Sequence, residues 1–173
     1  PTPTASRCST SSSARPTRAP GARPGLAAHP PGYAAYSRRM AQHQSTPIEE
    51  YALLGDTETA ALVSRAGSID WLCLPRFDSA ACFAALLGTP ENGRWLLGPK
   101  DAARSTRRYV EDSFVLETIH ETDTGAVKVL DLMPLGDGRA DIVRSVEGLR
   151  GHVTMRHEWV VRFEYGTVMP WVS

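Results

Sequence analysis

The chain has 173 residues, of which 42% are hydrophobic and 22% are charged, and this composition fits one ordinary domain with or without a tail. No run reaches the roughly 18 apolar residues that a membrane-spanning helix needs, so we expect no membrane segment. The net charge of zero hides two unlike segments. Six arginines and no acid occur up to Ile48, whereas 13 basic and 19 acidic residues follow from Glu49 onward.

Residues 1–46 are rich in Arg, Ser, Pro and Ala and carry too little apolar surface to offset the entropy of ordering them, so we predict a disordered tail. A transit peptide fits this composition loosely. Nucleic-acid binding is not expected, because lysine clusters are absent. Since Met40 is a plausible natural start, residues 1–39 also fit an upstream coding artefact. Three cysteines without a signal peptide favour a reducing, cytoplasmic location.

From residue 47 the dominant hydrophobic period is two, which predicts β-strands. The strand candidates, in chain order, are YALLG, TAALVSR, SIDWLCL, RWLLG, SFVLETIHE, AVKVLDLM, DIVRSVEG and GHVTMRHEWVVRF. Turn sequences such as GDTET, RAGS and ETDTG separate them. The last candidate places His157 and Trp159 on its apolar face, so we expect Trp159 to be buried and His157 to be a hydrogen-bonded core histidine.

One segment, Ala80–Leu87 (AACFAALL), has a helical pattern, with Asp78 or Ser79 as its N-cap. Many short strands and one short helix predict a mainly β fold, an antiparallel β-sandwich over residues 47–173. The chain stops directly after FEYGTVMPWVS, where nothing pairs the last strand. We therefore expect a sandwich that is truncated at its C-terminus.

Known catalytic motifs are absent from the sequence. HEWVV begins like the zinc motif H-E-x-x-H, but Val161 stands where the second histidine must be. Asp70 and Asp78 are of the right type for the carboxylate pair of a glycoside hydrolase. However, Asp70 is suited to satisfying turn amides and Asp78 to capping. The sequence therefore predicts no catalytic residue, no metal site and no cofactor in this chain.

Six motifs carry a family resemblance. They are PIEEYALLGDTETAALVSRAGSIDWLCLPRFDSAACFAALLG, GRWLLGP, TRRYVEDSFVLET, VLDLMP, DIVRSVEGLRGHVTM and VRFEYG…PWV. In order and spacing they closely resemble the N-terminal domain of bacterial glycoside hydrolase family 15 proteins, which include glucoamylases and trehalases. The resemblance implies a β-sandwich followed by a linker and a large α/α barrel. In that barrel two glutamates, neither of them within the matched region, carry out inverting hydrolysis of α-glucosidic bonds.

The resemblance also suggests a role for DWLCLPRFDS, as a loop by which the sandwich meets the barrel near its sugar-binding mouth. In this interpretation Asp70 and Arg76 hold the loop by charge-assisted hydrogen bonds. Trp71 and Phe77 supply an apolar contact or a sugar-stacking face, and Asp78 completes the candidate contact set.

The structural alternative gives these residues no contact with barrel or substrate. Trp71 would then belong to the core, on the same strand face as Ile69 and Cys73, and Arg76 would form a local surface pair with Asp78.

Three functions remain open on the sequence. The first is the accessory domain of an α-glucoside hydrolase, whose partners would be the absent catalytic barrel and α-glucosides such as trehalose or malto-oligosaccharides. The second is a free-standing carbohydrate-binding module that uses tryptophans as stacking platforms, the candidates being Trp71, Trp95, Trp159 and Trp171. The third is a truncated product without activity of its own.

Overall fold

The computed structural model describes residues 46–101, 104–136 and 138–171, and the predicted tail lies outside these residues apart from Thr46. Ten strands and four short 3-10 helices make up the described chain. In order they are η1 (Ile48–Glu50), β1 (Tyr51–Gly55), β2 (Ala60–Ser64), β3 (Ser68–Cys73), β4 (Ala81–Phe83), η2 (Ala85–Leu87), η3 (Pro90–Asn92), β5 (Arg94–Pro99), β6 (Arg104–Tyr109), β7 (Leu116–Thr122), β8 (Gly125–Leu132), β9 (Val143–Gly151), β10 (Met155–Val160) and η4 (Glu164–Gly166).

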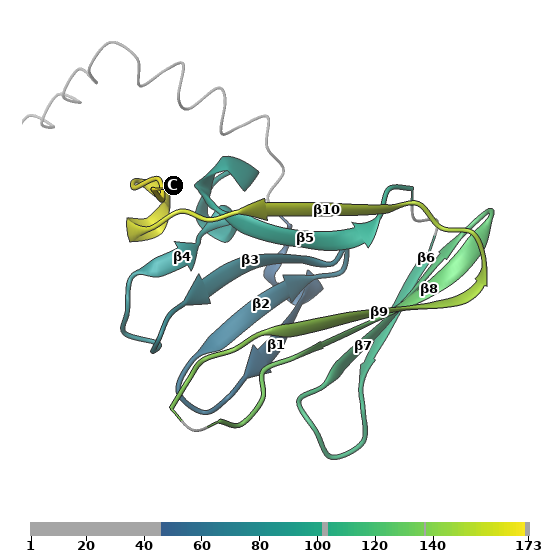
Figure 1. Cartoon of the computed structure of the whole chain (residues 1–173), viewed down its shortest axis with the longest axis horizontal. Helices are drawn as coiled ribbons and strands as arrows, with labels where there is room; N and C mark the ends of the chain where they lie inside the picture. The colour runs from purple at the N-terminus through teal and green to yellow at the C-terminus, as the bar shows by residue number, and fades with distance from the viewer. Residues whose placement is uncertain (1–45, 102–103, 137, 172–173) are drawn as a thin grey trace, which may run out of the picture.

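The strands form two antiparallel sheets, as predicted (Figure 1). The first sheet has the order β1-β2-β3-β5-β10, with β4 paired to β3, and the second has the order β6-β7-β8-β9. The main core is built chiefly by the first sheet, including Leu54, Val63 and Ile69. Leu116 of β7 and Met133, which follows β8, add to it. The mainly β, two-sheet fold is therefore confirmed.

The helix predicted over Ala80–Leu87 is wrong. This segment forms strand β4 and the single 3-10 turn η2. Phe83 pairs with Leu72 of β3 and is buried in the core. A short, continuously apolar run does not distinguish a buried helix from a buried strand, and here pairing with β3 decides for the strand.

The second sheet shows the period of two clearly. Leu116, Thr118 and His120 of β7 are buried, whereas the residues between them are partly exposed. The exposed face carries cross-strand ion pairs, among them Arg108–Glu117 at 2.8 Å. Such exposed pairs contribute little to stability, so this face acts mainly as a solvated surface.

A buried arginine of the second sheet is ion-paired within its own sheet and also binds the first sheet. Arg144 of β9 donates from Nε to Asp131 of β8 at 2.8 Å, and both side chains are 1% exposed. The guanidinium also donates to the main-chain oxygens of Trp95 and Gly67, each at 2.8 Å. It lies 5.2 Å from the centroid of the Trp95 ring. One side chain of the second sheet thus binds the first sheet at two places.

A second link between the sheets involves Tyr109 of β6. Its hydroxyl donates to the main-chain oxygen of Leu53 at 2.8 Å and accepts from the main-chain N–H of the same residue at 2.9 Å. Leu53 lies at the middle of β1, the edge strand of the first sheet. Both free backbone groups of this position are therefore satisfied by one side chain.

His120 is fully buried on β7. Its Nδ1 lies 2.8 Å from the Ser105 hydroxyl, whereas Nε2 has no hydrogen-bond partner within the part of the chain that the structure describes. Burial lowers the pKa of His120, the Asp131 carboxylate opposes this effect, and the Arg144 guanidinium adds to it. The folded protein therefore favours the neutral imidazole.

This arrangement predicts acid sensitivity of the fold. Because the pKa is lowered on folding, the unfolded chain binds more protons once the pH falls to about 6.5, the ordinary pKa of histidine, so stability falls with pH below that value. We expect the urea midpoint to be constant above pH 7.5 and to decrease between pH 7 and 5.5. His120→Gln should flatten this decrease, because the side chain that titrates is then absent. An unaltered slope in His120→Gln would contradict the assignment.

Candidate functional site

Asp70 occupies a bulge of β3. Val63 pairs with Ile69 and Leu62 with Trp71, so Asp70 is an extra residue in β3 that faces no partner on β2. It is only 8% exposed and accepts hydrogen bonds from the Tyr51 hydroxyl at 2.8 Å and from the Ser68 hydroxyl. Burial and the hydrogen bond to Asp70 raise the pKa of Tyr51 to about 12. Asp70 of β3 is therefore bound to Tyr51 of β1, on the far side of β2.

The bulge also changes the side of the sheet on which Trp71 lies. Ile69 belongs to the main core, whereas Trp71 packs against a second small cluster that contains Cys73 and Ala84. The alternative is thus wrong in placing Trp71 on the same face as Ile69, because one inserted residue reverses the alternation, and correct in placing it with Cys73. The Trp71 ring is partly exposed and lies 6.1 Å from the Tyr165 ring.

The remaining three candidate residues lie together in the loop after β3. Arg76 donates from Nε to Asp78 at 3.0 Å, and this hydrogen bond lowers the pKa of Asp78. Phe77 is 64% exposed, although its main-chain N–H donates to the main-chain oxygen of Glu58 at 3.1 Å. The loop therefore holds its backbone in place and presents an aromatic ring and an ion pair to solvent.

The structure thus divides the five predicted residues into three environments. Arg76, Phe77 and Asp78 share the exposed loop, Trp71 covers the small cluster, and Asp70 is bound to Tyr51. Asp70 and Arg76 were both expected to hold the loop by charge-assisted hydrogen bonds. Arg76 makes its bond within the loop, to Asp78, whereas Asp70 accepts from the strand residues Tyr51 and Ser68.

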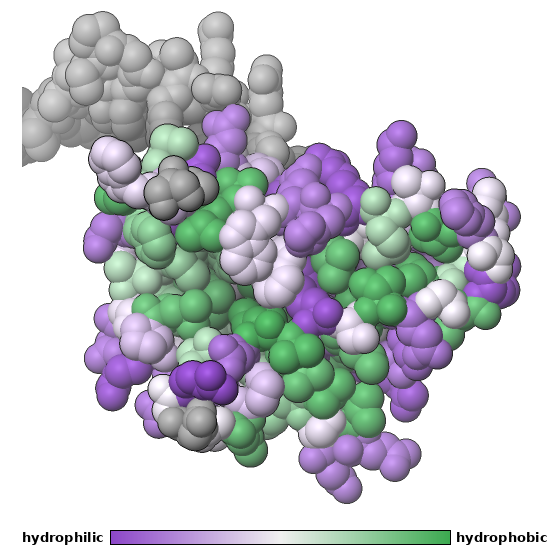
Figure 2. Space-filling model, in the orientation of Figure 1, coloured by the Kyte–Doolittle hydropathy of each residue, from purple (hydrophilic) through white to green (hydrophobic). Residues whose placement is uncertain are grey.

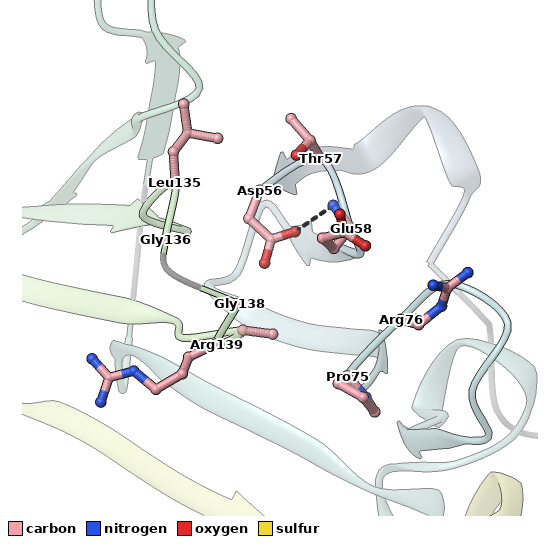
Figure 3. A pocket seen from close by; sticks show the side chains of 10 residues that line it. Asp56, Thr57, Glu58, Pro75, Arg76, Leu135, Gly136, Gly138 and Arg139 are labelled. Carbon is pink, nitrogen blue, oxygen red and sulfur yellow. Dashed lines mark hydrogen bonds between the residues drawn. The ribbon is translucent and has the colours of Figure 1, made fainter.

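A pocket of about 460 Å³ lies beside the loop (Figure 3). It is formed by three segments: the β1–β2 turn, the start of the 75–79 loop, and residues around Leu135 and Arg139. The lining side chains include the carboxylates of Asp56 and Glu58. Sequence reasoning recognised GDTET only as a turn and missed these two acids. The one signal available in the sequence was the spacing of two acids within this turn.

Asp56 is held rigidly at the pocket. Its Oδ1 accepts the main-chain N–H groups of Glu58 at 2.9 Å and Thr59 at 2.8 Å, and the residue is 6% exposed. Short polar side chains favour this turn geometry because they bind backbone amides two or three residues ahead. In Figure 3 the carboxylate points into the hollow, whereas the Arg76 and Arg139 side chains extend away from it on opposite sides.

An exposed apolar surface lies between β9 and β10. Figure 2 shows hydrophobic side chains gathered across this part of the face seen in Figure 1. Trp159 is 55% exposed, with its ring centroid 4.5 Å from that of Trp95 and 5.6 Å from that of Phe83. The expectation that Trp159 is buried is therefore wrong. Because β10 is an edge strand, the described residues of the second sheet leave this end of the shared face uncovered.

His157 lies on the same uncovered face. It accepts a hydrogen bond from Trp95 Nε1 at 3.0 Å, as a core histidine would, but it is exposed. The predicted hydrogen bond is present and the predicted burial is not. Trp171 is also exposed, so two of the four tryptophans stand open to solvent.

Within residues 46–101, 104–136 and 138–171, no group of three or more His, Cys, Asp or Glu side chains could hold a metal ion. No helix in the same ranges is long and apolar enough to cross a membrane.

The chain is similar to one part of several known proteins. The family model described as trehalase-like, N-terminal matches residues 37–172. A trehalase of Mycobacterium tuberculosis is 44% identical over 91 residues, which cover 52% of this chain and 13% of that protein. Trehalase 1 of Sulfolobus acidocaldarius is 33% identical over 124 residues, which cover 71% of this chain and 21% of that protein. The chain therefore spans only a small part of these relatives. No solved structure matches it.

Proposed function

Because this chain belongs to the trehalase-like N-terminal family, we propose that it is the accessory domain of an α-glucoside hydrolase of the trehalase or glucoamylase type. The family match over residues 37–172 carries the proposal. In it, the chain supports a catalytic barrel that belongs to the same polypeptide and that performs inverting hydrolysis with two glutamates of its own. Trehalose is the first substrate to consider, since the similar proteins are trehalases.

The 75–79 loop is the proposed contact with the barrel. Its backbone is fixed by the hydrogen bond to Glu58, while Phe77 stands 64% exposed and Arg76 lies beside it with its charge already partnered by Asp78. An exposed aromatic ring next to a polar rim is typical of a contact surface. Asp70 then acts indirectly, by bracing β3, and Trp71 supports the loop from the small cluster.

A chimera tests this role. The trehalase-like N-terminal region of the Mycobacterium tuberculosis trehalase is replaced by residues 37–172 of this chain, and glucose release from trehalose is measured. We expect the chimera to be active and the chain alone to be inactive. In the chimera, Arg76→Ala/Phe77→Ala should lower kcat/KM at least tenfold, because interface anchors contribute on the order of 2 kcal/mol.

The matched control is Phe114→Ala/Arg150→Ala. Phe114 is 62% exposed, and Arg150 of β9 is an arginine about as exposed as Arg76. This control should retain full activity. An inactive chimera that is nevertheless folded would refute the accessory role. An active chimera in which the loop variant loses nothing would refute the loop as the contact.

A carbohydrate-binding module remains the second candidate, favoured by the exposed Trp159 ring beside Trp95. Flat aromatic faces bind sugars through their apolar side. Titrating the chain with glucose, maltose and trehalose while recording tryptophan fluorescence separates the two functions. Quenching that disappears in Trp159→Ala would support the module, and an unchanged spectrum would exclude it.

A further inference from the structure

Outer strands of the two sheets differ in how readily they can pair with a second molecule. Strand β6 carries three arginines and no acid, so two β6 strands would repel each other. Strand β9 is irregular, because Ala126 of β8 pairs with Arg150 and Val127 with Gly148, which leaves Leu149 as an extra residue. Charges and bulges of this kind protect an edge against pairing. Strands β6 and β9 are thus poor templates for a further strand.

Strand β10 offers a regular edge. It pairs with β5 residue for residue along its whole length, without a register shift. The Lys100 N–H donates to the Thr154 oxygen at 2.9 Å, so the backbone of Thr154 is turned toward β5. Because backbone groups alternate sides along an antiparallel strand, those of Met155, His157 and Trp159 are turned to the outer side of the sheet. No strand within the described residues pairs on that side, and Figure 1 shows β10 at the border of the first sheet.

The charges of β10 are arranged so that two copies of the strand complement each other. Arg156 and Glu158 lie one position to either side of His157 and share one face of the strand. If two β10 strands pair antiparallel about His157, Arg156 of each copy lies opposite Glu158 of the other. Opposite charges in such cross-strand positions stabilise a sheet. Within one copy Glu158 already binds Arg94 and Arg156, so this pairing buries no uncompensated charge.

The other face of β10 supplies the apolar part of the contact. In the same register Met155 of each copy lies opposite Trp159 of the other. The Trp159 side chain is 55% exposed and forms part of the uncovered apolar surface between β9 and β10. A methionine thioether packs favourably against an aromatic ring. The register that pairs the charges on one face therefore also covers an exposed tryptophan on the opposite face.

We infer that β10 is a self-association surface, through which two copies of this chain join their first sheets about a two-fold axis at His157. Met155, His157 and Trp159 then exchange backbone hydrogen bonds with the second copy, and the two sheets become one. The second copy is the occupant because the strand is complementary to itself in charge and in side-chain size. The inference is independent of the accessory role, since it uses β10 and not the 75–79 loop.

The test measures the mass of the full chain in solution, by light scattering after size exclusion, at increasing concentration. We expect a mass that rises toward twice 18.8 kDa. His157→Pro should raise the dimer Kd at least tenfold, because proline fits an edge strand at an outward position but has no N–H to donate. His157→Ala keeps this N–H and should remain dimeric. A chain that is monomeric at every concentration would overturn the inference.

Arg156→Glu is the second variant, and it decides the matter where His157→Pro does not fold. It places carboxylates opposite each other at both ends of the paired strands and should also raise the dimer Kd at least tenfold. Arg150→Glu is the matched control, because Arg150 lies on the edge strand β9 and its side chain is 61% exposed, against 56% for Arg156. It should leave the dimer Kd unchanged. An equal or larger effect of Arg150→Glu would place the contact elsewhere and refute the inference.

Cross-linking tests the register. In the paired strands the two copies of His157 lie opposite each other, with Cα atoms about 5.5 Å apart, which a disulfide can span. His157→Cys should therefore form a disulfide-linked dimer on air oxidation, and a reducing agent should reverse it. Arg156→Cys is displaced from its own copy along the strand and should link no more than the unsubstituted chain, which has three cysteines. Equal cross-linking of the two variants would show that the strands do not pair about His157.

Discussion

Replacing Arg144 by methionine is expected to destabilise the fold by about 3–5 kcal/mol, because it leaves the Asp131 carboxylate buried without its cation. The pair is 1% exposed on both sides, so water cannot replace the lost partner. The variant also removes the donors that bind the main-chain oxygens of Trp95 and Gly67. Since a domain of this size has a total stability of roughly 5–15 kcal/mol, much of it should be lost.

Urea unfolding followed by tryptophan fluorescence measures this effect. Arg108→Met is the matched control, since it breaks the exposed pair with Glu117 and should change stability by less than about 1 kcal/mol. The double variant Asp131→Leu/Arg144→Met should recover part of the loss, because both charges are then gone. Equal urea midpoints for Arg144→Met and Arg108→Met would show that the buried pair does not hold the sheets together.

Gly67→Ala is expected to cost about 3–4 kcal/mol by a different mechanism, combining backbone strain with overpacking. Gly67 has φ +83°, and a Cβ built there would lie 2.3 Å from the main-chain oxygen of Leu97. That oxygen belongs to β5 and cannot move without shifting the strand. The Gly67 oxygen also accepts from Leu97 and Arg144, so the same shift would disturb the connection between the sheets.

Gly138→Ala separates the two causes in this prediction. Gly138 has a similar φ of +87°, but a Cβ there would meet no atom of the described residues within 4 Å. Its substitution should therefore show the strain alone, about 1–2 kcal/mol. Thermal unfolding of both variants gives the comparison. If Gly67→Ala lost no more than Gly138→Ala, close contact with β5 would not be the reason for glycine at this turn.

The strands predicted well from the sequence are those in which apolar residues alternate with polar ones because one face of the strand is buried. The pattern YALLG coincides with β1, and AVKVLDLM matches β8 to within one residue at each end. Strand β6 was missed because its sequence, RSTRRY, has no apolar alternation. It is an edge strand, and pairing with β7 rather than burial of its own side chains makes it a strand.

Only one member of the buried ion pair, Asp131, could have been predicted from the sequence to need a buried partner. Asp131 alternates with Val129 and Met133, and this places a carboxylate on an inward face where it needs a partner. Its partner, Arg144, lies in the following strand between unremarkable neighbours. Which of the many arginines turns inward depends on strand register, and no local pattern encodes the register.

The candidate site was predictable to a similar extent. The exposed loop with Arg76 and Phe77 follows from the break at Pro75 after an apolar strand. The pocket does not, because its lining comes from three segments more than 15 residues apart in sequence. The bulge at Asp70 could not be predicted for the same reason. Alternation along β3 is regular in the sequence, and only the pairing with β2 shows that one residue is extra.

The hydroxyl of Tyr109 has a consequence for self-association. An edge strand normally offers unpaired N–H and C=O groups on which a strand from another molecule can add. At the centre of β1 both groups of Leu53 are already bound by Tyr109 of the same chain. A neighbouring strand would have to displace this side chain before it could pair there. The Tyr109 hydroxyl thus blocks the central position of this edge strand. Pairing of β1 with a strand of another chain is therefore disfavoured.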